Sequence, residues 1–150
     1  MRSGYAGFRN RVRTTLFGNI TDDLTLHNYL ALRVRPAGDP RTRTAYFVNI
    51  QTDGPIPTDL WQHRLYLPEN SSGNTWESVI IPLESFVLTN AGETASEQLS
   101  MMRSRIRGNA KVAGAYELGI DYIGAIEYMQ DAEALDRLVN KPEETKVSPQ

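Results

Sequence analysis

The clearest alternation of hydrophobic and polar positions lies in residues 29–36, which read YLALRVRP. Aliphatic residues recur there at every second position, and Arg33 and Arg35 occupy two of the positions between them. The aliphatic members are Leu30, Leu32 and Val34. A period of two is typical of a β-strand with one buried face. After the turn-forming stretch PAGDPRTR, residues 46–50 alternate again, so the pattern predicts one β-hairpin over 29–50.

Further short apolar segments predict more strands, at 60–67, 76–83, 85–89, 101–107 and 116–128. Residues 76–83 are apolar on both faces at Val79, Ile80 and Ile81, which predicts a central, well-buried strand. Residues 14–28 are interpreted as a connection with at most one turn of helix, and residues 108–114 as a turn. Seven or eight strands at short spacing predict an all-β sandwich.

One short helix is predicted near the C-terminus. Asp131 suits its N-cap, Ala134, Leu135 and Leu138 follow at helical spacing, and Pro142 stops it. The domain organisation expected is a β-sandwich over 1–130, a helix over 131–140 and a disordered tail over 141–150.

Composition narrows the class of protein. The 150 residues are 40% hydrophobic and 23% charged, as in an ordinary globular domain. The absence of cysteine excludes disulfides and thiolate metal sites. No apolar run approaches the roughly 20 residues that span a bilayer. The early arginines at 9, 11 and 13 superficially look like a mitochondrial transit peptide, but they repeat at strand spacing and not at helical spacing.

Candidate catalytic chemistry is sparse. The sequence lacks GxGxxG, Walker and GxSxG motifs, and His27 and His63 lie in no ligand-spaced cluster. Loop carboxylates can bind a hard cation, but solvated turn residues are the better interpretation; these are Asp22, Asp23, Asp53 and Asp59. A pair of carboxylates for glycoside hydrolysis requires geometry to identify, and the candidates are Glu77, Glu84, Asp121 and Glu127. We therefore expect no enzyme activity, no metal and no cofactor.

Arginines give the most distinctive pattern. Thirteen of the 16 basic residues are arginine, and they recur at strand spacing in three groups: 9/11/13, 33/35 and 103/105/107. If those strands are neighbours, the arginines form an array on one outward sheet face, a surface suited to protein partners. The alternative is a solvated face paired with acids, because residues 116–150 carry eight acids against three bases. Nucleic-acid binding is less favoured, since the net charge is −2.

Five segments in order carry a family resemblance: GYAGFR, LALRVR, YFVNI, WESVIIPLESFVLTN and YELGIDYIGAIE. Together they resemble the complex I intermediate-associated protein family, over roughly residues 3–128. The resemblance implies a sandwich, jelly-roll in type and similar to galactose-binding domains. It also implies a non-catalytic assembly factor or chaperone for mitochondrial respiratory complex I. Relatives carry strands and a transit peptide before GYAGFR, so this chain is expected to be N-terminally truncated.

The implied partners are membrane-arm subunits of complex I and other assembly factors, on the matrix side of the inner membrane, which the chain would contact without spanning it. The interface residues predicted are Arg33, Arg35, Arg103, Arg105 and Arg107. Asn49 and Asp121, in the VNI and IDxI segments, are expected to organise loops and turns. Residues RSRIRGNA depart from the family pattern, where relatives have an apolar segment. A carbohydrate-binding module, stacking a sugar on Trp61, Tyr66 or Trp76, is the alternative function.

Overall fold

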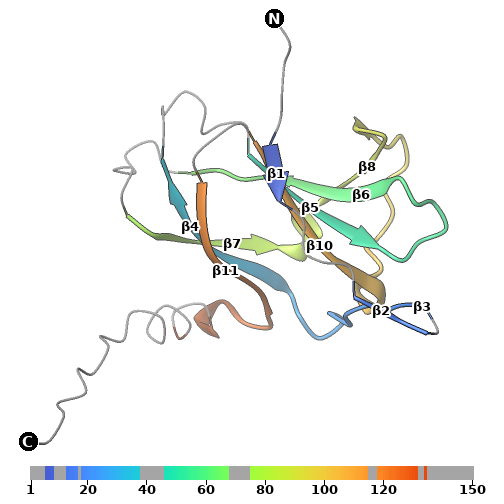
Figure 1. Cartoon of the computed structure of the whole chain (residues 1–150), viewed down its shortest axis with the longest axis horizontal. Helices are drawn as coiled ribbons and strands as arrows, with labels where there is room; N and C mark the ends of the chain where they lie inside the picture. The colour runs from blue at the N-terminus through green and yellow to red at the C-terminus, as the bar shows by residue number, and fades with distance from the viewer. Residues whose placement is uncertain are drawn as a thin grey trace, which may run out of the picture.

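A computed structural model describes residues 6–8, 13–16, 18–37, 46–67, 75–114, 118–131 and 134 (Figure 1). Its strands are β1 (Ala6–Phe8), β2 (Thr14–Thr15), β3 (Gly18–Asn19), β4 (Tyr29–Pro36), β5 (Phe47–Thr52), β6 (Asp59–Arg64), β7 (Glu77–Pro82), β8 (Val87–Asn90), β9 (Glu93–Thr94), β10 (Ile106–Gly114) and β11 (Leu118–Ile126). Two 3-10 helices accompany them, η2 (Leu83–Ser85) and η3 (Arg103–Arg105).

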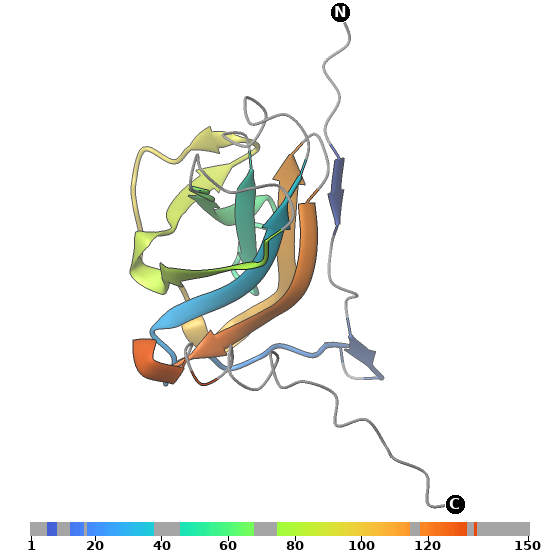
Figure 2. The same cartoon turned by 90° about the vertical axis from the view of Figure 1, so that its left-hand side faces the viewer.

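Two antiparallel sheets form the layers of the domain. One has the strand order β1-β10-β5-β6-β8-β9, the other has the order β11-β4-β7, and β2 and β3 form a separate small hairpin. Figures 1 and 2 show the three-stranded sheet stacked against the larger one. The predicted all-β sandwich is confirmed, whereas its closer likeness to galactose-binding domains stays a prediction.

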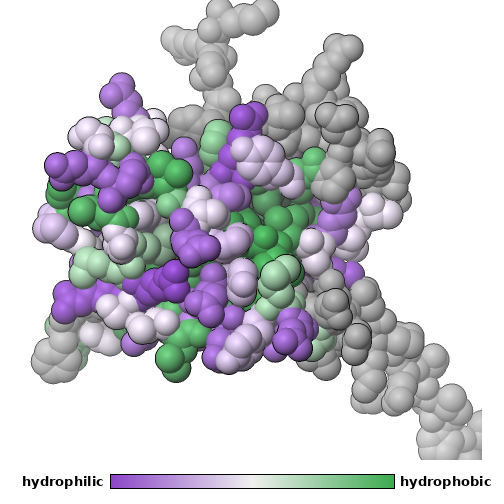
Figure 3. Space-filling view, turned by 180° about the vertical axis from the view of Figure 1, so that it is seen from behind, coloured by the Kyte–Doolittle hydropathy of each residue, from purple (hydrophilic) through white to green (hydrophobic). Residues whose placement is uncertain are grey.

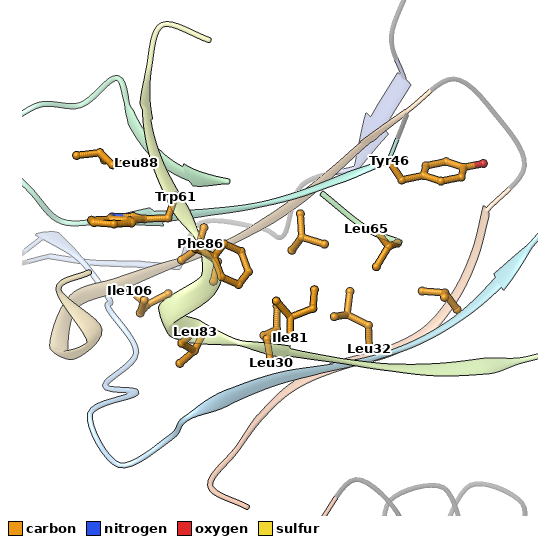
Figure 4. Close-up of a cluster of buried hydrophobic side chains, with 13 residues drawn as sticks. Leu30, Leu32, Tyr46, Trp61, Leu65, Ile81, Leu83, Phe86, Leu88 and Ile106 are labelled. Atoms are coloured by element: carbon orange, nitrogen blue, oxygen red, sulfur yellow. The ribbon is translucent and has the colours of Figure 1, made fainter. Parts of the chain in front are cut away.

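The core lies between the two sheets. Leu32, Val34 and Val48 are fully shielded from solvent, because alternate residues of β4 and β5 point into the space between the layers. Figure 4 shows the buried side chains between β4, β7 and β11 on one side and β5, β6 and β10 on the other. Trp61 and Phe86 close the core at the β6–β8 side. The apolar face predicted for residues 29–36 is therefore the central part of the core.

The predicted hairpin over 29–50 is wrong. β4 pairs with β11 and β7, whereas β5 pairs with β10 and β6, so the two strands belong to different sheets. Both strands place apolar residues toward the same core from opposite sides. A sandwich allows this because consecutive strands can cross from one layer to the other.

The strand predicted over 76–83 is confirmed as β7, but its expected central position is wrong. β7 pairs only with β4 among the described residues and forms one edge of the three-stranded sheet. Its inner side is apolar because Ile81 enters the core. Its outer side is apolar because Ile80 packs with Ala31 and Ile126 on the opposite face of the sheet.

The strand predicted over 101–107 and the turn predicted over 108–114 are also wrong. Residues 103–105 form η3, and β10 begins only at Ile106 and continues through the expected turn to Gly114. The pairing of β10 with β5 shifts register between Arg107 and Lys111, which marks a bulge or irregularity. A bulge breaks the period of two, so the pattern concealed this strand.

Other predicted elements agree in part. β6, β8 and β11 lie within or beside the segments predicted at 60–67, 85–89 and 116–128. Residues 14–28 contain the β2–β3 hairpin, and an isolated bridge joins Asp22 to Ile106. Helical residues begin at 129, so Asp131 lies inside the first turn and is not its N-cap; its carboxylate accepts a hydrogen bond from the backbone N–H of Tyr128 at 3.1 Å. Apart from 134, the rest of the predicted helix and the tail lie outside the described residues.

Replacing Leu32 by alanine tests the central position of β4. Leu32 is fully buried, so we expect Leu32→Ala to lower the free energy of unfolding by about 2–5 kcal/mol. Val87→Ala is the control, because Val87 is 42% exposed and its truncation is expected to cost less than about 0.5 kcal/mol. Urea denaturation measures both variants, and equal losses would contradict the packing described.

Candidate binding surface

The outer face of the three-stranded sheet gathers charged and aromatic side chains. Because Leu32 and Val34 face the core, Arg33 and Arg35 of β4 project to this outer face. Trp76 comes just before β7, which pairs with β4 on one side, and β11 pairs with it on the other. We call the set Arg33, Arg35, Trp76, Gly119 and Asp121 the arginine–tryptophan surface.

Both arginines approach the indole of Trp76. The Arg35 Cζ atom lies 5.1 Å from the ring centroid and the Arg33 Cζ atom lies 5.8 Å from it. At these distances a guanidinium is attracted to the ring face, by about 0.5–1 kcal/mol at an exposed site. Trp76 is 39% exposed and Arg35 is exposed, so the pair presents both a planar apolar ring and a positive charge to solvent.

A glycine on β11 gives the indole its space. Gly119 pairs with Arg35 across the sheet. A Cβ atom at this position would lie 3.3 Å from Cη2 of Trp76 and 3.4 Å from Cβ of Arg35. These separations are tighter than ordinary van der Waals contact, so a side chain here would displace its neighbours. The lack of a side chain lets Trp76 extend over β4 as far as β11.

A partly buried ion pair with β11 holds Arg33 in place. Its Nη1 donates to Oδ2 of Asp121 at 3.0 Å, and the side chains are 10% and 37% exposed respectively. Asp121 lies where the β11–β4 register shifts between Ile120 and Tyr122, so it is the extra residue of a bulge. A nearly buried guanidinium requires such a partner, because an unpaired buried charge is strongly unfavourable.

The remaining predicted interface arginines lie elsewhere, so the expected array on one sheet face is wrong. Arg107 belongs to β10 in the other sheet, and its Nε donates to Oδ1 of Asp53 at 3.0 Å. Arg103 donates from Nη1 to the carbonyl of His27 at 3.2 Å. Arg105 is exposed in η3. The prediction failed because β4 and β10 are not neighbours in a sheet.

Asn49 and Asp121 do not organise loops as expected, since both lie inside strands. Asn49 is 4% exposed on the outer side of β5, and its Oδ1 accepts a hydrogen bond from Nε2 of Gln62 at 2.9 Å. Gln62 is its register partner on β6. This bond joins two strands and satisfies a buried polar group.

Candidate metal-binding groups do not converge in the described part of the chain. No group of three or more His, Asp or Glu side chains there can hold a metal ion. Asp22 and Asp53 pair with arginines, and Asp59 accepts from Nδ2 of Asn90 at 2.7 Å. These three carboxylates, named above as possible cation ligands, therefore engage protein donors.

His63 and Ser85 form a close pair, but the proton lies the wrong way for nucleophile activation. Oγ of Ser85 donates to the carbonyl of Pro82 at 2.7 Å, and Nδ1 of His63 lies 3.1 Å from the same Oγ and 3.3 Å from the carbonyl of Ser85. The hydroxyl proton of Ser85 is thus directed to a backbone carbonyl and not to the imidazole. A catalytic base would instead accept the serine proton.

One carboxyl group and one hydroxyl group away from this surface have shifted pKa values with local causes. Hydrogen bonds from the side chain and backbone N–H of Thr25 lower the pKa of the Asp23 carboxyl. The neighbouring Glu127 carboxylate raises the pKa of the Tyr128 hydroxyl. Both groups are exposed on loops, so these shifts describe local turn chemistry.

The three aromatic residues considered for sugar stacking differ in access. Trp61 is 6% exposed and belongs to the core, and Trp76 is engaged by two arginines. Tyr66 is 72% exposed, with the Arg64 Cζ atom 5.9 Å from its ring centroid. It borders a hollow of about 320 Å³ on the side of the larger sheet, which also involves Phe47 and His63. Tyr66 is the most exposed of the three rings, and Arg64 lies over it as the two arginines lie over Trp76.

Comparison with known proteins assigns the family. A sequence model of the family described as Complex I intermediate-associated protein 30 (CIA30) matches residues 1–118. The chain belongs to the CIA30 family. The resemblance seen in its five sequence segments is thereby confirmed.

A curated CIA30 relative extends this match. The chain is 36% identical over 137 residues to the Neurospora crassa protein named "Complex I intermediate-associated protein 30, mitochondrial". The aligned region covers 87% of this chain and 46% of the relative, so the chain spans about half the length of that relative. Among the described residues, none forms a helix with the length and hydropathy needed to cross a bilayer.

Sequence reasoning selected three of the five residues that form the arginine–tryptophan surface of this CIA30-family chain. It selected Arg33 and Arg35 for the interface and Asp121 for loops and turns, and it considered Trp76 for sugar stacking. A signal existed: counting back by twos from Ile80 puts Trp76 on the outer face. Gly119 had no signal, because only the packed arrangement shows what its missing side chain would strike.

A valine in place of Gly119 tests the geometry of the surface. We expect Gly119→Val to displace the Trp76 ring and lower the free energy of unfolding by about 1–3 kcal/mol. Acrylamide quenching of tryptophan fluorescence should rise, because Trp76 becomes more accessible. Gly124→Val is the matched control on the same strand, since nothing lies within 4 Å of a Cβ at Gly124. Equal quenching in both variants would contradict the proposed contact.

Proposed function

We propose that this chain acts in the assembly of respiratory complex I as a non-catalytic docking factor, and that the arginine–tryptophan surface contacts an assembly intermediate. Membership of the CIA30 family supports the assembly role, and the name of the Neurospora crassa relative describes that protein as intermediate-associated and mitochondrial. Within this proposal the partner is a membrane-arm intermediate, met together with other assembly factors on the matrix side of the inner membrane.

The observation that carries the choice of surface is the contact of Arg35 with a half-exposed Trp76. Tryptophan and arginine are the side chains most enriched among residues that dominate binding energy at protein interfaces. Gly119 and the Arg33–Asp121 pair fix the ring and its neighbours before any partner arrives. Such preorganisation reduces the entropy lost on binding.

The arginines predicted for the interface take different parts in this proposal. Arg35 makes contact, and Arg33 supports Trp76 from a nearly buried position. Arg103 and Arg107 hold loops through the carbonyl of His27 and the carboxylate of Asp53. The partner surface that fits best is therefore acidic and contains an exposed apolar or planar group, which can lie on the indole beside Arg35.

Charge reversal at Arg35 tests the proposal. The tagged chain is incubated with detergent-solubilised mitochondrial membranes, and the captured proteins are quantified by mass spectrometry. We expect recovery of complex I intermediates to fall about tenfold or more with Arg35→Glu, because a like charge now faces an acidic partner.

Arg64→Glu provides the matched control for this experiment. Arg64 also lies over an aromatic ring, that of Tyr66, but on the other sheet. Recovery should be unchanged with Arg64→Glu. Equal recovery with wild type and Arg35→Glu would exclude this surface, and the absence of complex I subunits from every sample would refute the assembly role.

Carbohydrate binding is the second candidate, and the exposure of Tyr66 is the observation that favours it. A sugar that binds only the folded chain must stabilise it, by about 2.7 kcal/mol at a concentration of 100 times Kd. Thermal unfolding with a panel of monosaccharides measures this. If the candidate is correct, one sugar raises the unfolding temperature of wild type and of Trp76→Ala but not of Tyr66→Ala. If no sugar raises the unfolding temperature, this candidate function is excluded.

A further inference from the structure

One end of the sandwich carries an unusual number of exposed hydrophobic side chains. Six of the eleven large hydrophobic residues that are exposed in the described part of the chain lie on loops at this end; they are Leu16, Ile20, Leu26, Ile56, Leu99 and Met102. We call this region, formed by the β2–β3 hairpin, the 24–28 turn, the β5–β6 connection and residues 99–105, the loop end. Figure 1 shows the β2–β3 hairpin and the β5–β6 connection at the same end.

The helix η3 links two of these loops. The backbone N–H of Leu24 donates to the carbonyl of Arg103 at 2.7 Å, and that of Asp53 donates to the carbonyl of Arg105 at 2.7 Å. Asp22 and Ile106 exchange two backbone hydrogen bonds, at 2.7 and 3.0 Å. Because residues 22–24 and the β5–β6 connection share this anchor, their relative positions are fixed and they lose little freedom on binding.

The three most exposed of these hydrophobic side chains lie on separate loops. Leu16 is 100% exposed, Leu26 is 77% exposed and Leu99 is 64% exposed, and each belongs to a different loop. Figure 3 shows hydrophobic residues on the side opposite to that of Figure 1 as patches between hydrophilic ones. A protein interface buries its apolar residues as a contiguous core that fits matching pockets. Exposed side chains on separate loops instead fit a deformable surface that can surround each of them.

Arginines lie behind the tips. Arg105 is exposed in η3, and Arg103 in the same helix reaches the 24–28 turn through the carbonyl of His27. Of the nearby acids, Asp22 pairs with Arg13 and Asp53 pairs with Arg107, whereas Asp23 accepts hydrogen bonds only from the neutral Thr25 and Glu84 lies beside Leu99 and Arg103. Long arginine side chains behind apolar residues can place their charge at the level of lipid headgroups.

We propose that the loop end docks onto a lipid bilayer surface, with its leucine tips entering the boundary between headgroups and acyl chains. Arg105 and Arg103 then meet headgroup phosphates. β4 runs from Tyr29, beside the loop end, to Arg35, six residues away and so roughly 20 Å along the strand. Docking in this orientation keeps the arginine–tryptophan surface clear of the bilayer and free for a protein partner.

Flotation with vesicles tests the proposal on the full chain. The probes are vesicles of phosphatidylcholine alone and of phosphatidylcholine with one fifth phosphatidylglycerol. We expect wild type to float with both, and more strongly with the anionic mixture. The double variant Leu16→Ser/Leu26→Ser should lower the partition coefficient on both by about tenfold or more, because the apolar surface that inserts is lost.

Two sets of variants separate insertion from general stickiness and from misfolding. Tyr66→Ser/Val87→Ser removes two hydrophobic residues exposed elsewhere, by 72% and 42%, and should float as wild type does. Arg105→Glu should weaken flotation on the anionic vesicles more than on the neutral ones. If Leu16→Ser/Leu26→Ser unfolds at a lower temperature than wild type, Ile56→Ser/Leu99→Ser takes its place. Failure of wild type to float, or equal losses with the two double variants, overturns the proposal.

Discussion

The structure depends on the burial of alternate residues of β4 between two sheets. Leu30, Leu32 and Val34 enter the core, and this placement leaves Arg33 and Arg35 on the outer face. A shift of the strand by one residue would bring two guanidinium groups into the core and expose three aliphatic side chains, so the register is strongly fixed. The position of every contact on the outer face follows from that register, since β7 and β11 both align on β4.

Local patterns predicted much of the secondary structure but not the pairing of strands. The alternation in 29–36 identified β4 correctly, because the physical cause of the pattern, one buried face, is local. The partners of β4 are β7 and β11, which are distant in sequence, and no residue pattern near β4 names them. The predicted hairpin with β5 failed for this reason. β10 was missed for a different reason: its register shifts between Arg107 and Lys111, and this breaks the alternation of the sequence.

The candidate surface was predictable only where it consists of charges at strand spacing. Arg33 and Arg35 could be selected from sequence, but the difference in their burial could not be predicted. Burial depends on which side chains from β11 and from the segment before β7 cover each of them. Trp76 crosses above Arg35, and Asp121 reaches Arg33 from β11. Arg103 and Arg107 repeat at similar spacing and yet hold loops together. Spacing therefore reveals the direction of a side chain and leaves its partners undetermined.

The bulge at Asp121 also sets the number of residues that β11 must contain. Ile120 and Ile123 both pack against the core, although they are three positions apart in the sequence. Gly119 and Tyr122 are also three positions apart, and both pair with outward-facing residues of β4. A regular strand cannot do this with a period of two. If the single residue at the bulge were deleted, the side chains of β11 before or after it would exchange inner and outer faces. Those on the other side of the bulge would keep their faces. The strand is thus constrained in length as well as in composition, and substitutions are tolerated there more readily than insertions or deletions.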